Sequence, residues 1–232
     1  YEKQLLVKDD LEKIISKLKL GEIDGINVTV PFKNSVIPYI DELSIEAEKT
    51  QSVNTIYCKN NKTIGHNTDI AGFELGLRHF KYNVLEKKVL ILGAGGVVPS
   101  IIFALKKMGA SHIVLSNRTK SKAENIKKIF PEIGIIDWGK TGEFHMIINA
   151  TSIGLKSDDE IKINYNGFGK NKFFYDVIYN PKQTNFLKKA KELGNKIENG
   201  KMMFIYQAHQ AFAIWHKIFP EIDIETIKLL DD

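Results

Sequence analysis

The sequence contains little cysteine or tryptophan and no long apolar run. Among its 232 residues, Cys58 is the single cysteine and two residues are tryptophan. One cysteine cannot form an internal disulfide framework or a cysteine-rich zinc site. No apolar run approaches the roughly 18 residues that cross a bilayer, and no signal-peptide pattern opens the chain. These absences predict a cytoplasmic protein with no membrane segment and no metal.

Charge is mixed along the chain rather than gathered into blocks. The net charge is +5, from 33 basic and 28 acidic residues, and the lysines are scattered among the acids. Nucleic-acid-binding proteins usually concentrate their basic residues, so this pattern predicts a small anionic partner and no nucleic acid. The length and the hydrophobic fraction of 43% are ordinary for one large or two modest globular domains.

Helical and strand patterns alternate along most of the chain. Before residue 70 we expect strands at 3–7 and 25–30, helical stretches at 9–21 and 38–50, and a hairpin centred on 59–62. After a helix at 69–80, short apolar strands alternate with helices, which is typical of βαβ units around a parallel sheet. We therefore expect two α/β lobes, with the final helices packing back on the first lobe.

One predicted strand has polar side chains on a single face. In the stretch GINVTVPFK, alternate residues share a face, so Asn27, Thr29 and, beyond the turn, Lys33 line one side. A strand buried on both faces would have valine or isoleucine at these positions. The pattern therefore indicates a wet pocket for a polar ligand.

A glycine-rich turn follows the first strand of the second lobe. The stretch VLILGAGGVVPS joins an apolar strand to a helix through Gly93, Gly95 and Gly96. Dinucleotide-binding folds use glycine here to make the tight turn and to bring backbone N–H groups to the pyrophosphate. The third glycine of the G-x-G-x-x-G pattern is absent, because Val98 occupies its position. A glycine-rich turn that binds no ligand stays open as the alternative.

The tip of the next strand distinguishes NADP from NAD. An NAD-binding sheet usually has an acidic residue there, whereas this chain has Asn117, Arg118 and Thr119. A guanidinium can bind a phosphate through two hydrogen bonds, so the tip favours NADP, with an exposed loop arginine as the alternative. A later strand ends in small polar residues at Asn149–Gly154, where we expect Thr151 to lie along the nicotinamide ribose.

Several short motifs occur together in one order: NVTVPFK, SVNT, GHNTD, GAGG, NRT, NATSIG and YQAHQAF. In this combination the chain resembles the shikimate dehydrogenase family over essentially its whole length. The resemblance implies an open α/β substrate domain at 1–70, a Rossmann-like domain with a doubly wound parallel sheet for the dinucleotide at 71–201, and C-terminal helices at 202–232 that return to the substrate domain. It also implies reversible reduction of 3-dehydroshikimate to shikimate with NADP, in the pathway to aromatic amino acids.

The resemblance further implies roles for individual residues. Lys33 and Asp69 form the catalytic pair, in which the Lys33 ammonium stabilises the developing alkoxide and protonates it. Asp69 also fits an N-cap that opens a helix. The substrate-binding residues, with Asn27 added from the strand pattern, are Asn27, Thr29, Asn54, Tyr179 and Gln207. The cofactor contacts, with Thr151 added from the strand end, are Gly93, Ala94, Gly95, Gly96, Val97, Asn117, Arg118, Thr119, Lys122, Thr151, Val177 and Gly200.

Three departures from the family pattern leave other interpretations open. The family opens with a segment that carries a Ser-x-Ser pair for the substrate carboxylate; this chain has no such pair, so we expect an N-terminally truncated form. Lys122 stands where the family often has a second arginine, and Met202 stands where it usually has glycine. The alternatives are a quinate/shikimate dehydrogenase of broader specificity and a catalytically impaired NADP-binding module. We expect a monomer or a homodimer.

Overall fold

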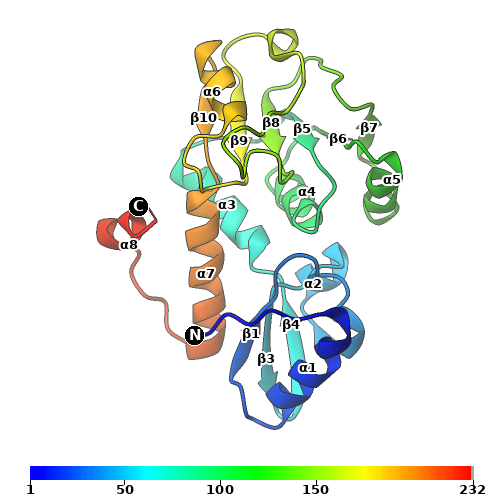
Figure 1. Ribbon diagram of the computed structural model, residues 1–232, viewed down its shortest axis with the longest axis vertical. Helices are drawn as coiled ribbons and strands as arrows, with labels where there is room; N and C mark the ends of the chain where they lie inside the picture. The colour runs from blue at the N-terminus through cyan, green and yellow to red at the C-terminus, as the bar shows by residue number, and fades with distance from the viewer. Residues whose placement is uncertain (231–232) are drawn as a thin grey trace.

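The computed structural model describes residues 1–230 as two lobes, each built on its own β-sheet. The strands are β1 Gly25–Asn27, β2 Glu42–Leu43, β3 Thr55–Lys59, β4 Lys62–His66, β5 Lys88–Leu92, β6 His112–Ser116, β7 Gly134–Ile136, β8 Met146–Asn149, β9 Phe173–Asp176 and β10 Lys196–Glu198. The α-helices are α1 Leu11–Lys19, α2 Ile45–Thr50, α3 Asp69–His79, α4 Val98–Lys107, α5 Lys120–Ile129, α6 Asn185–Glu192, α7 Lys201–His216 and α8 Ile224–Lys228. Figure 1 shows the two sheets at opposite ends of the molecule, with α3 and α7 joining them.

The helix α1 packs on the smaller sheet because its apolar residues recur at helical spacing. Leu11, Ile14, Ile15 and Leu18 lie on one face of the helix, and all four are buried. The helix ends just before Gly21, whose φ of 74° suits glycine. The smaller sheet has the strand order β1-β3-β4-β2. Ile14, Ile15 and Leu18 of α1 belong to a hydrophobic core formed by residues of the first lobe.

The strands β3 and β4 form the antiparallel hairpin that the sequence predicts. Asn60 and Asn61 make the tight turn with φ angles of 52° and 60°, a conformation that asparagine tolerates better than most residues. The register pairs Lys59 with Lys62 and Thr55 with His66. This register brings the residues just before β3 next to those just after β4.

The N-terminal part of the smaller lobe differs from the prediction in two places. Residues 3–7 form no strand, and Leu5 is 95% exposed, because β1 pairs with β3 alone and no strand pairs with this stretch. The helical stretch expected at 38–50 is divided into a short 3-10 helix at Ile37–Tyr39, the strand β2 and the helix α2.

The strand expected at 25–30 is shorter than predicted. It ends at Asn27, and the chain then turns where the Phe32 N–H donates to the Thr29 carbonyl at 2.9 Å. The alternation of faces therefore ends at Asn27, and the shared face expected for Asn27, Thr29 and Lys33 does not form.

The larger sheet is parallel throughout, in the order β10-β9-β8-β5-β6-β7. From β5 the chain moves outward to β6 and β7, then crosses back to β8, β9 and β10, which is the doubly wound dinucleotide-binding order. Residues 89–92 of β5 are apolar and buried because packed clusters lie on both faces of the sheet. The predicted fold class is confirmed, and the topological switch point lies between β5 and β8.

Close packing of α3 against α7 connects the lobes. A Cβ at Gly72 would lie 2.7 Å from the Met203 carbonyl oxygen, so glycine is needed for this approach. The last turn of α7 reaches the smaller sheet, where Trp215 Nε1 donates to the Ile56 carbonyl at 3.2 Å. The late helix therefore lies along both lobes.

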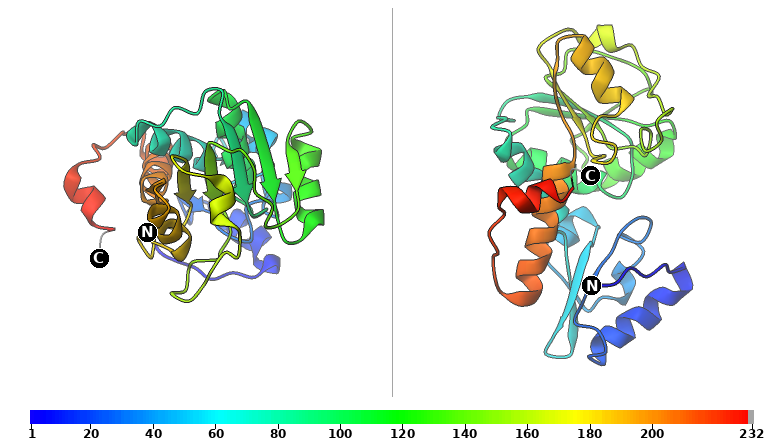
Figure 2. Two further views of the ribbon diagram at one scale, coloured as in Figure 1. Left: turned by 90° about the horizontal axis from the view of Figure 1, so that it is seen from above. Right: turned by 60° about the vertical axis from the view of Figure 1, so that its left-hand side comes forward.

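The expected domain limits at residues 71 and 201 fall inside α3 and at the first residue of α7, and the division itself stays a prediction. Figure 1 and the left view of Figure 2 show α8 standing away from both lobes, and none of its residues is buried. No helix within residues 1–230 is long and apolar enough to cross a membrane.

Candidate active site

Lys33 and Asp69 meet at the junction of the lobes, although they are 36 positions apart in the chain. Lys33 Nζ lies 2.5 Å from Asp69 Oδ2, and the two side chains are 12% and 7% exposed. Asp69 is the first residue of α3 and Thr68 is its N-cap, so the N-cap alternative for Asp69 is wrong. Because the Asp69 carboxylate does not cap the helix, it is available to bind the Lys33 ammonium.

Asn54 fixes the orientation of the Asp69 carboxylate. Its amide nitrogen donates to Asp69 Oδ1 at 3.0 Å and to Thr68 Oγ1 at 2.9 Å, while its amide oxygen accepts the Thr68 N–H at 2.8 Å. Gln207 Oε1, on α7, lies 3.5 Å from the same amide nitrogen. The first lobe and the late helix thus converge on one polar cluster around the Asp69 carboxylate.

Asn27 supports this cluster from β1. Its amide nitrogen donates to the Asn54 carbonyl and to Thr55 Oγ1, both at 3.1 Å, and its amide oxygen accepts the Tyr1 hydroxyl at 3.0 Å. Both ends of the Asn27 amide are therefore occupied by protein groups, in contrast to the open pocket that the strand pattern predicts.

Thr29 and Tyr179 take no part in the hydrogen bonds around Lys33 and Asp69. Thr29 is exposed in the turn after β1, and Tyr179 is half-buried, with its ring stacked on Phe204 at a centroid distance of 4.5 Å. Neither side chain makes a hydrogen bond to another group of residues 1–230. Both side chains are therefore available to a ligand.

The turn after β5 needs glycine for steric reasons. Gly93 has a φ of 113°, and a Cβ there would lie 2.7 Å from the Ala150 carbonyl oxygen. Gly95 and Gly96 are exposed, and the N–H groups of residues 94–96 donate to no acceptor in the described part of the chain. These groups stand immediately before α4, whose N-terminus adds positive potential. The turn therefore fits an anionic pyrophosphate.

This glycine turn lies directly beside Lys33. A Cβ at Gly96 would lie 3.9 Å from both Cβ and Cδ of Lys33. Ser52 Oγ also donates to the Gly96 carbonyl at 3.2 Å, which joins the turn to the first lobe. A dinucleotide held by the turn would extend toward the amine of Lys33.

The loop after β6 presents cations at the edge of the same site. The Asn117 amide donates to the Thr119 carbonyl at 2.7 Å and so fixes the loop. Arg118 and Lys122 are exposed next to it, and residues 117–122 include no acid. Arg118 and Lys122, with no carboxylate among residues 117–122, fit the additional phosphate of NADP.

The three remaining predicted cofactor residues lie at the ends of β8 and β9 and at the start of α7. Thr151 is held by the Asn149 amide oxygen, which accepts its N–H at 3.0 Å and its hydroxyl at 2.7 Å. A Cβ at Gly200 would collide with the Val177 carbonyl, so glycine allows α7 to start against this strand end. The Val177 N–H also donates to the Asn149 carbonyl at 2.9 Å, so Thr151, Val177 and Gly200 belong to one connected group of loops.

The sequence interpretation missed the buried polar bridge between the lobes. Asn67 Nδ2 donates to Ser100 Oγ at 2.8 Å and to Thr50 Oγ1 at 3.1 Å, and Ser100 lies fully buried on α4. The available signal was the repeated Asn-Thr pair at each end of the hairpin, at residues 54–55 and 67–68. These repeated amides predict bonding between the hairpin ends, but they do not identify Ser100 as the partner.

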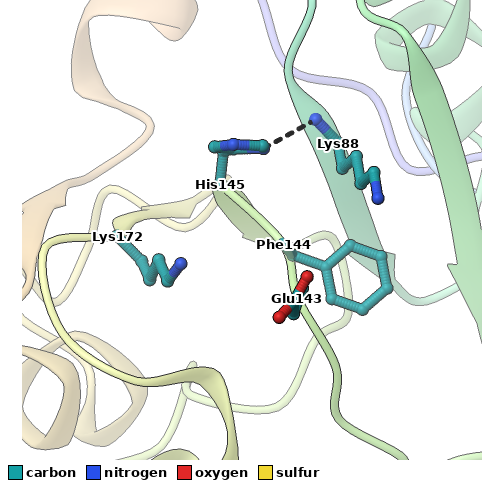
Figure 3. A pocket seen from close by; sticks show the side chains of 5 residues that line it. All are labelled: Lys88, Glu143, Phe144, His145 and Lys172. Carbon is teal, nitrogen blue, oxygen red and sulfur yellow. Dashed lines mark hydrogen bonds between the residues drawn. The ribbon is translucent and has the colours of Figure 1, made fainter.

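A separate cavity of about 300 Å³ lies at the opposite edge of the larger sheet (Figure 3). It is lined by Lys88, Glu143, Phe144, His145 and Lys172. The Lys88 N–H donates to His145 Nδ1 at 3.0 Å, and burial together with nearby lysines lowers the pKa of His145. Ligands of open α/β sheets bind at the carboxyl ends of the strands, so this amino-end cavity is not the candidate active site.

Residues 1–230 contain no cluster of three His, Cys, Asp or Glu side chains suited to a metal.

Comparison with known proteins identifies the family. A model of the shikimate dehydrogenase substrate binding domain matches residues 1–56, and a model of shikimate / quinate 5-dehydrogenase matches residues 74–153. The shikimate dehydrogenase (NADP(+)) of Pelagibacter ubique is 63% identical over 231 residues, which cover 100% of this chain and 87% of that protein. The chain belongs to the shikimate dehydrogenase family. The family predicted from the sequence motifs is therefore confirmed.

Solved shikimate dehydrogenases have the same two-lobed fold. The structure from Aquifex aeolicus is 36% identical, has a TM-score of 0.85, and matches 97% of this chain and 82% of that chain. The structure from Thermus thermophilus in complex with NADP(H) and shikimate is 27% identical, has a TM-score of 0.86, and matches 97% of this chain and 84% of that chain. These likenesses extend over both lobes and the junction where Lys33 and Asp69 meet.

Proposed function

We propose that this protein catalyses the reversible, NADP-dependent reduction of 3-dehydroshikimate to shikimate. The observation that carries the proposal is the buried pair of Lys33 and Asp69 beside the glycine turn at Gly96. Family membership supports it, as do the names of the relatives: the Pelagibacter ubique protein is a shikimate dehydrogenase (NADP(+)), and the Thermus thermophilus structure holds NADP(H) and shikimate.

The chain's own residues manage one proton in this reaction. NADPH, when bound, supplies the hydride that reaches the carbonyl carbon. Lys33 donates a proton to the carbonyl oxygen as negative charge develops there, and it takes that proton back in the oxidation direction. Asp69 accepts hydrogen bonds from Lys33 and Asn54, so the ammonium is held in one position throughout. Burial of the pair strengthens this electrostatic stabilisation because water screens it little.

The remaining polar residues around the pair orient the substrate. We propose that Asn54, Asp69 and Gln207 bind the ring hydroxyls, since all three belong to one hydrogen-bonded cluster. Thr29 and Tyr179 bind the carboxylate end, for which their hydroxyls are available. Asn27 acts through Asn54 and Thr55, to which its amide donates.

The dinucleotide is held across the carboxyl end of the larger sheet. The N–H groups at residues 94–97 bind the pyrophosphate at the start of α4, and the loop at 117–122 binds the adenosine end. Arg118 in the loop after β6 and Lys122 in the first turn of α5 bind the 2′-phosphate, which makes NADP the preferred cofactor. Thr151, Val177 and Gly200 line the nicotinamide end.

A direct test measures shikimate-dependent reduction of NADP⁺ by its absorbance, with quinate and NAD⁺ as the alternative substrate and cofactor. Turnover with shikimate and NADP⁺, and much slower turnover with quinate, supports the proposal. Comparable rates on quinate would favour the broader quinate/shikimate dehydrogenase, which the matched family description also covers. NADP⁺ binding without turnover on either substrate would favour the impaired module. We further propose that the protein is a monomer or a homodimer and that it is cytoplasmic. The single cysteine is consistent with the reducing cytoplasm.

A further inference from the structure

The buried carboxylate of Asp176 has no part in the proton transfer described above. Asp176 is the last residue of β9 and is 0% exposed. Asn149 Nδ2 donates to its two oxygens at 3.0 and 3.1 Å, the Ile178 N–H donates at 3.0 Å, and Thr184 Oγ1 donates at 2.6 Å. These donors come from three segments: the end of β8, the loop after β9 and the N-cap of α6.

Two of these segments carry the residues at the nicotinamide end. Asn149 binds Asp176 through its amide nitrogen and Thr151 through its amide oxygen, so the orientation of Thr151 depends on that amide. In the other segment, the Ile178 carbonyl accepts the Gly200 N–H at 3.2 Å. A single carboxylate is thus connected to both sides of the nicotinamide end.

We propose that Asp176 is a positioning residue for the dinucleotide, whose carboxylate ties the loop at 150–154 to the loop at 177–179. This role rests on the proposed use of NADP. Asp176 itself touches neither cofactor nor substrate, because protein groups surround it on every side. Its effect on the cofactor passes through Asn149 to Thr151 and through Ile178 to Gly200.

The chemistry of the cluster requires a carboxylate rather than an amide. An ionised aspartate only accepts hydrogen bonds, and its three partner groups, on Asn149, Ile178 and Thr184, all donate. An asparagine at 176 would put an NH₂ group in place of one acceptor oxygen, so at least one of the hydrogen bonds donated to position 176 would be lost.

Asp176 is fully buried, and three protein groups donate hydrogen bonds to it. Burial raises the pKa of Asp176 to about 6, and the hydrogen bonds from Thr184, Asn149 and Ile178 oppose that rise. The titratable side chains that sense its charge are Tyr165 and Tyr175, whose pKa values are raised mainly by burial. At neutral pH the group is therefore mostly ionised, and its anion depends on the three donors for stabilisation.

The test compares the variant Asp176→Asn with the matched variant Glu74→Gln. Glu74 is also a buried carboxylate, but it pairs with Lys107 in the last turn of α4, at the end of that helix away from the glycine turn. The measurement is the dissociation constant of NADPH, from titration of its fluorescence, together with the melting temperature of each protein. We expect Asp176→Asn to weaken NADPH binding by about tenfold or more and Glu74→Gln to leave it within about twofold of wild type. Wild-type affinity in Asp176→Asn would overturn the proposal, even if the melting temperature falls.

A second pair of variants keeps the test decisive if Asp176→Asn does not fold. Thr184→Val removes one donor to the carboxylate, whereas Thr184→Ser keeps that donor and the N-cap of α6. Weaker NADPH binding in the valine variant and wild-type binding in the serine variant support the positioning role, and unchanged binding in both overturns it. A wild-type protein that binds no NADP(H) would instead refute the proposed function itself, so the two failures are distinguishable.

Discussion

The substitution Lys33→Met tests the proposed chemistry most directly, because it removes the ammonium and keeps most of the side-chain stem. The stem matters because it packs against the glycine turn: a Cβ at Gly96 would lie 3.9 Å from Cβ and Cδ of Lys33. Methionine is unbranched and of similar length, and it fills the same space. The variant therefore separates proton transfer from packing, which Lys33→Ala does not.

We expect the substitution Lys33→Met to have two effects, one on turnover and one on stability. Loss of a positioned general acid costs about a hundredfold to ten-thousandfold in turnover, or about 3 to 5 kcal/mol of barrier. The second effect is on folding, because Asp69 is 7% exposed and loses its cation. Leaving one member of a buried ion pair alone costs about 3 to 5 kcal/mol, and the retained Asn54 hydrogen bond puts the expected loss near the lower end.

The assay combines turnover of shikimate with NADP⁺, NADPH affinity by fluorescence titration, and the free energy of unfolding from urea melts. We expect Lys33→Met to lose turnover, to keep NADPH affinity within about twofold, and to lose stability that Lys33→Met/Asp69→Asn partly restores. Restoration is expected because the double variant has no unpaired buried charge. A loss of turnover below about tenfold in Lys33→Met would refute the role of Lys33 as proton donor.

Three further predictions concern Arg118 in the loop after β6, the packing of α3 against α7, and the stability of the protein in acid. Arg118→Ala should weaken NADPH by about tenfold to a hundredfold and NADH far less, measured by titration; equal losses would show that Arg118 does not bind the 2′-phosphate. Gly72→Ala should lower the melting temperature more than Gly76→Ala, because the added Cβ would lie 2.7 Å from an α7 carbonyl at Gly72 and 3.3 Å from a backbone nitrogen at Gly76. Hydrogen bonds from Lys19 and Thr63 lower the pKa of Asp41 to about 2, so this carboxylate contributes stability above about pH 4 that is lost as the pH falls toward 2. Asp41→Asn should flatten that part of the stability profile by less than about 1 kcal/mol, because the pair is partly exposed, and an unchanged profile would contradict this assignment.

The larger lobe could be predicted from the sequence because its signals are local. Residues 89–92 form a continuous apolar run that needs cover on both faces, and glycines follow it where the chain must turn. In the smaller lobe, by contrast, residues 3–7 have a strand pattern but no neighbouring strand, and backbone pairing decides whether a strand exists.

The site could be predicted only in part, for a related reason. Family motifs pointed to Lys33 and Asp69, but nothing local in the sequence says that residues 36 positions apart touch. The supporting groups were harder still, because their roles depend on which side chains the fold brings together. Asn67 bonds to Ser100 on a helix of the other lobe, and Asp176 looks from the sequence like the polar end of an aromatic strand.

The orientation of the Asp69 carboxylate depends on a turn that lies at the far end of the β3–β4 hairpin. Asn60 and Asn61 adopt positive φ angles there, and the tight turn that results sets the register of the two strands. That register lets the Asn54 N–H donate to the His66 carbonyl at 3.0 Å, which places the Asn54 side chain against Asp69. A slip of one residue would send Asn54 to the opposite face of the sheet, because side chains alternate along a strand. The carboxylate would then lose the amide that orients it, although Lys33, Asn54 and Asp69 would all still be present in the sequence.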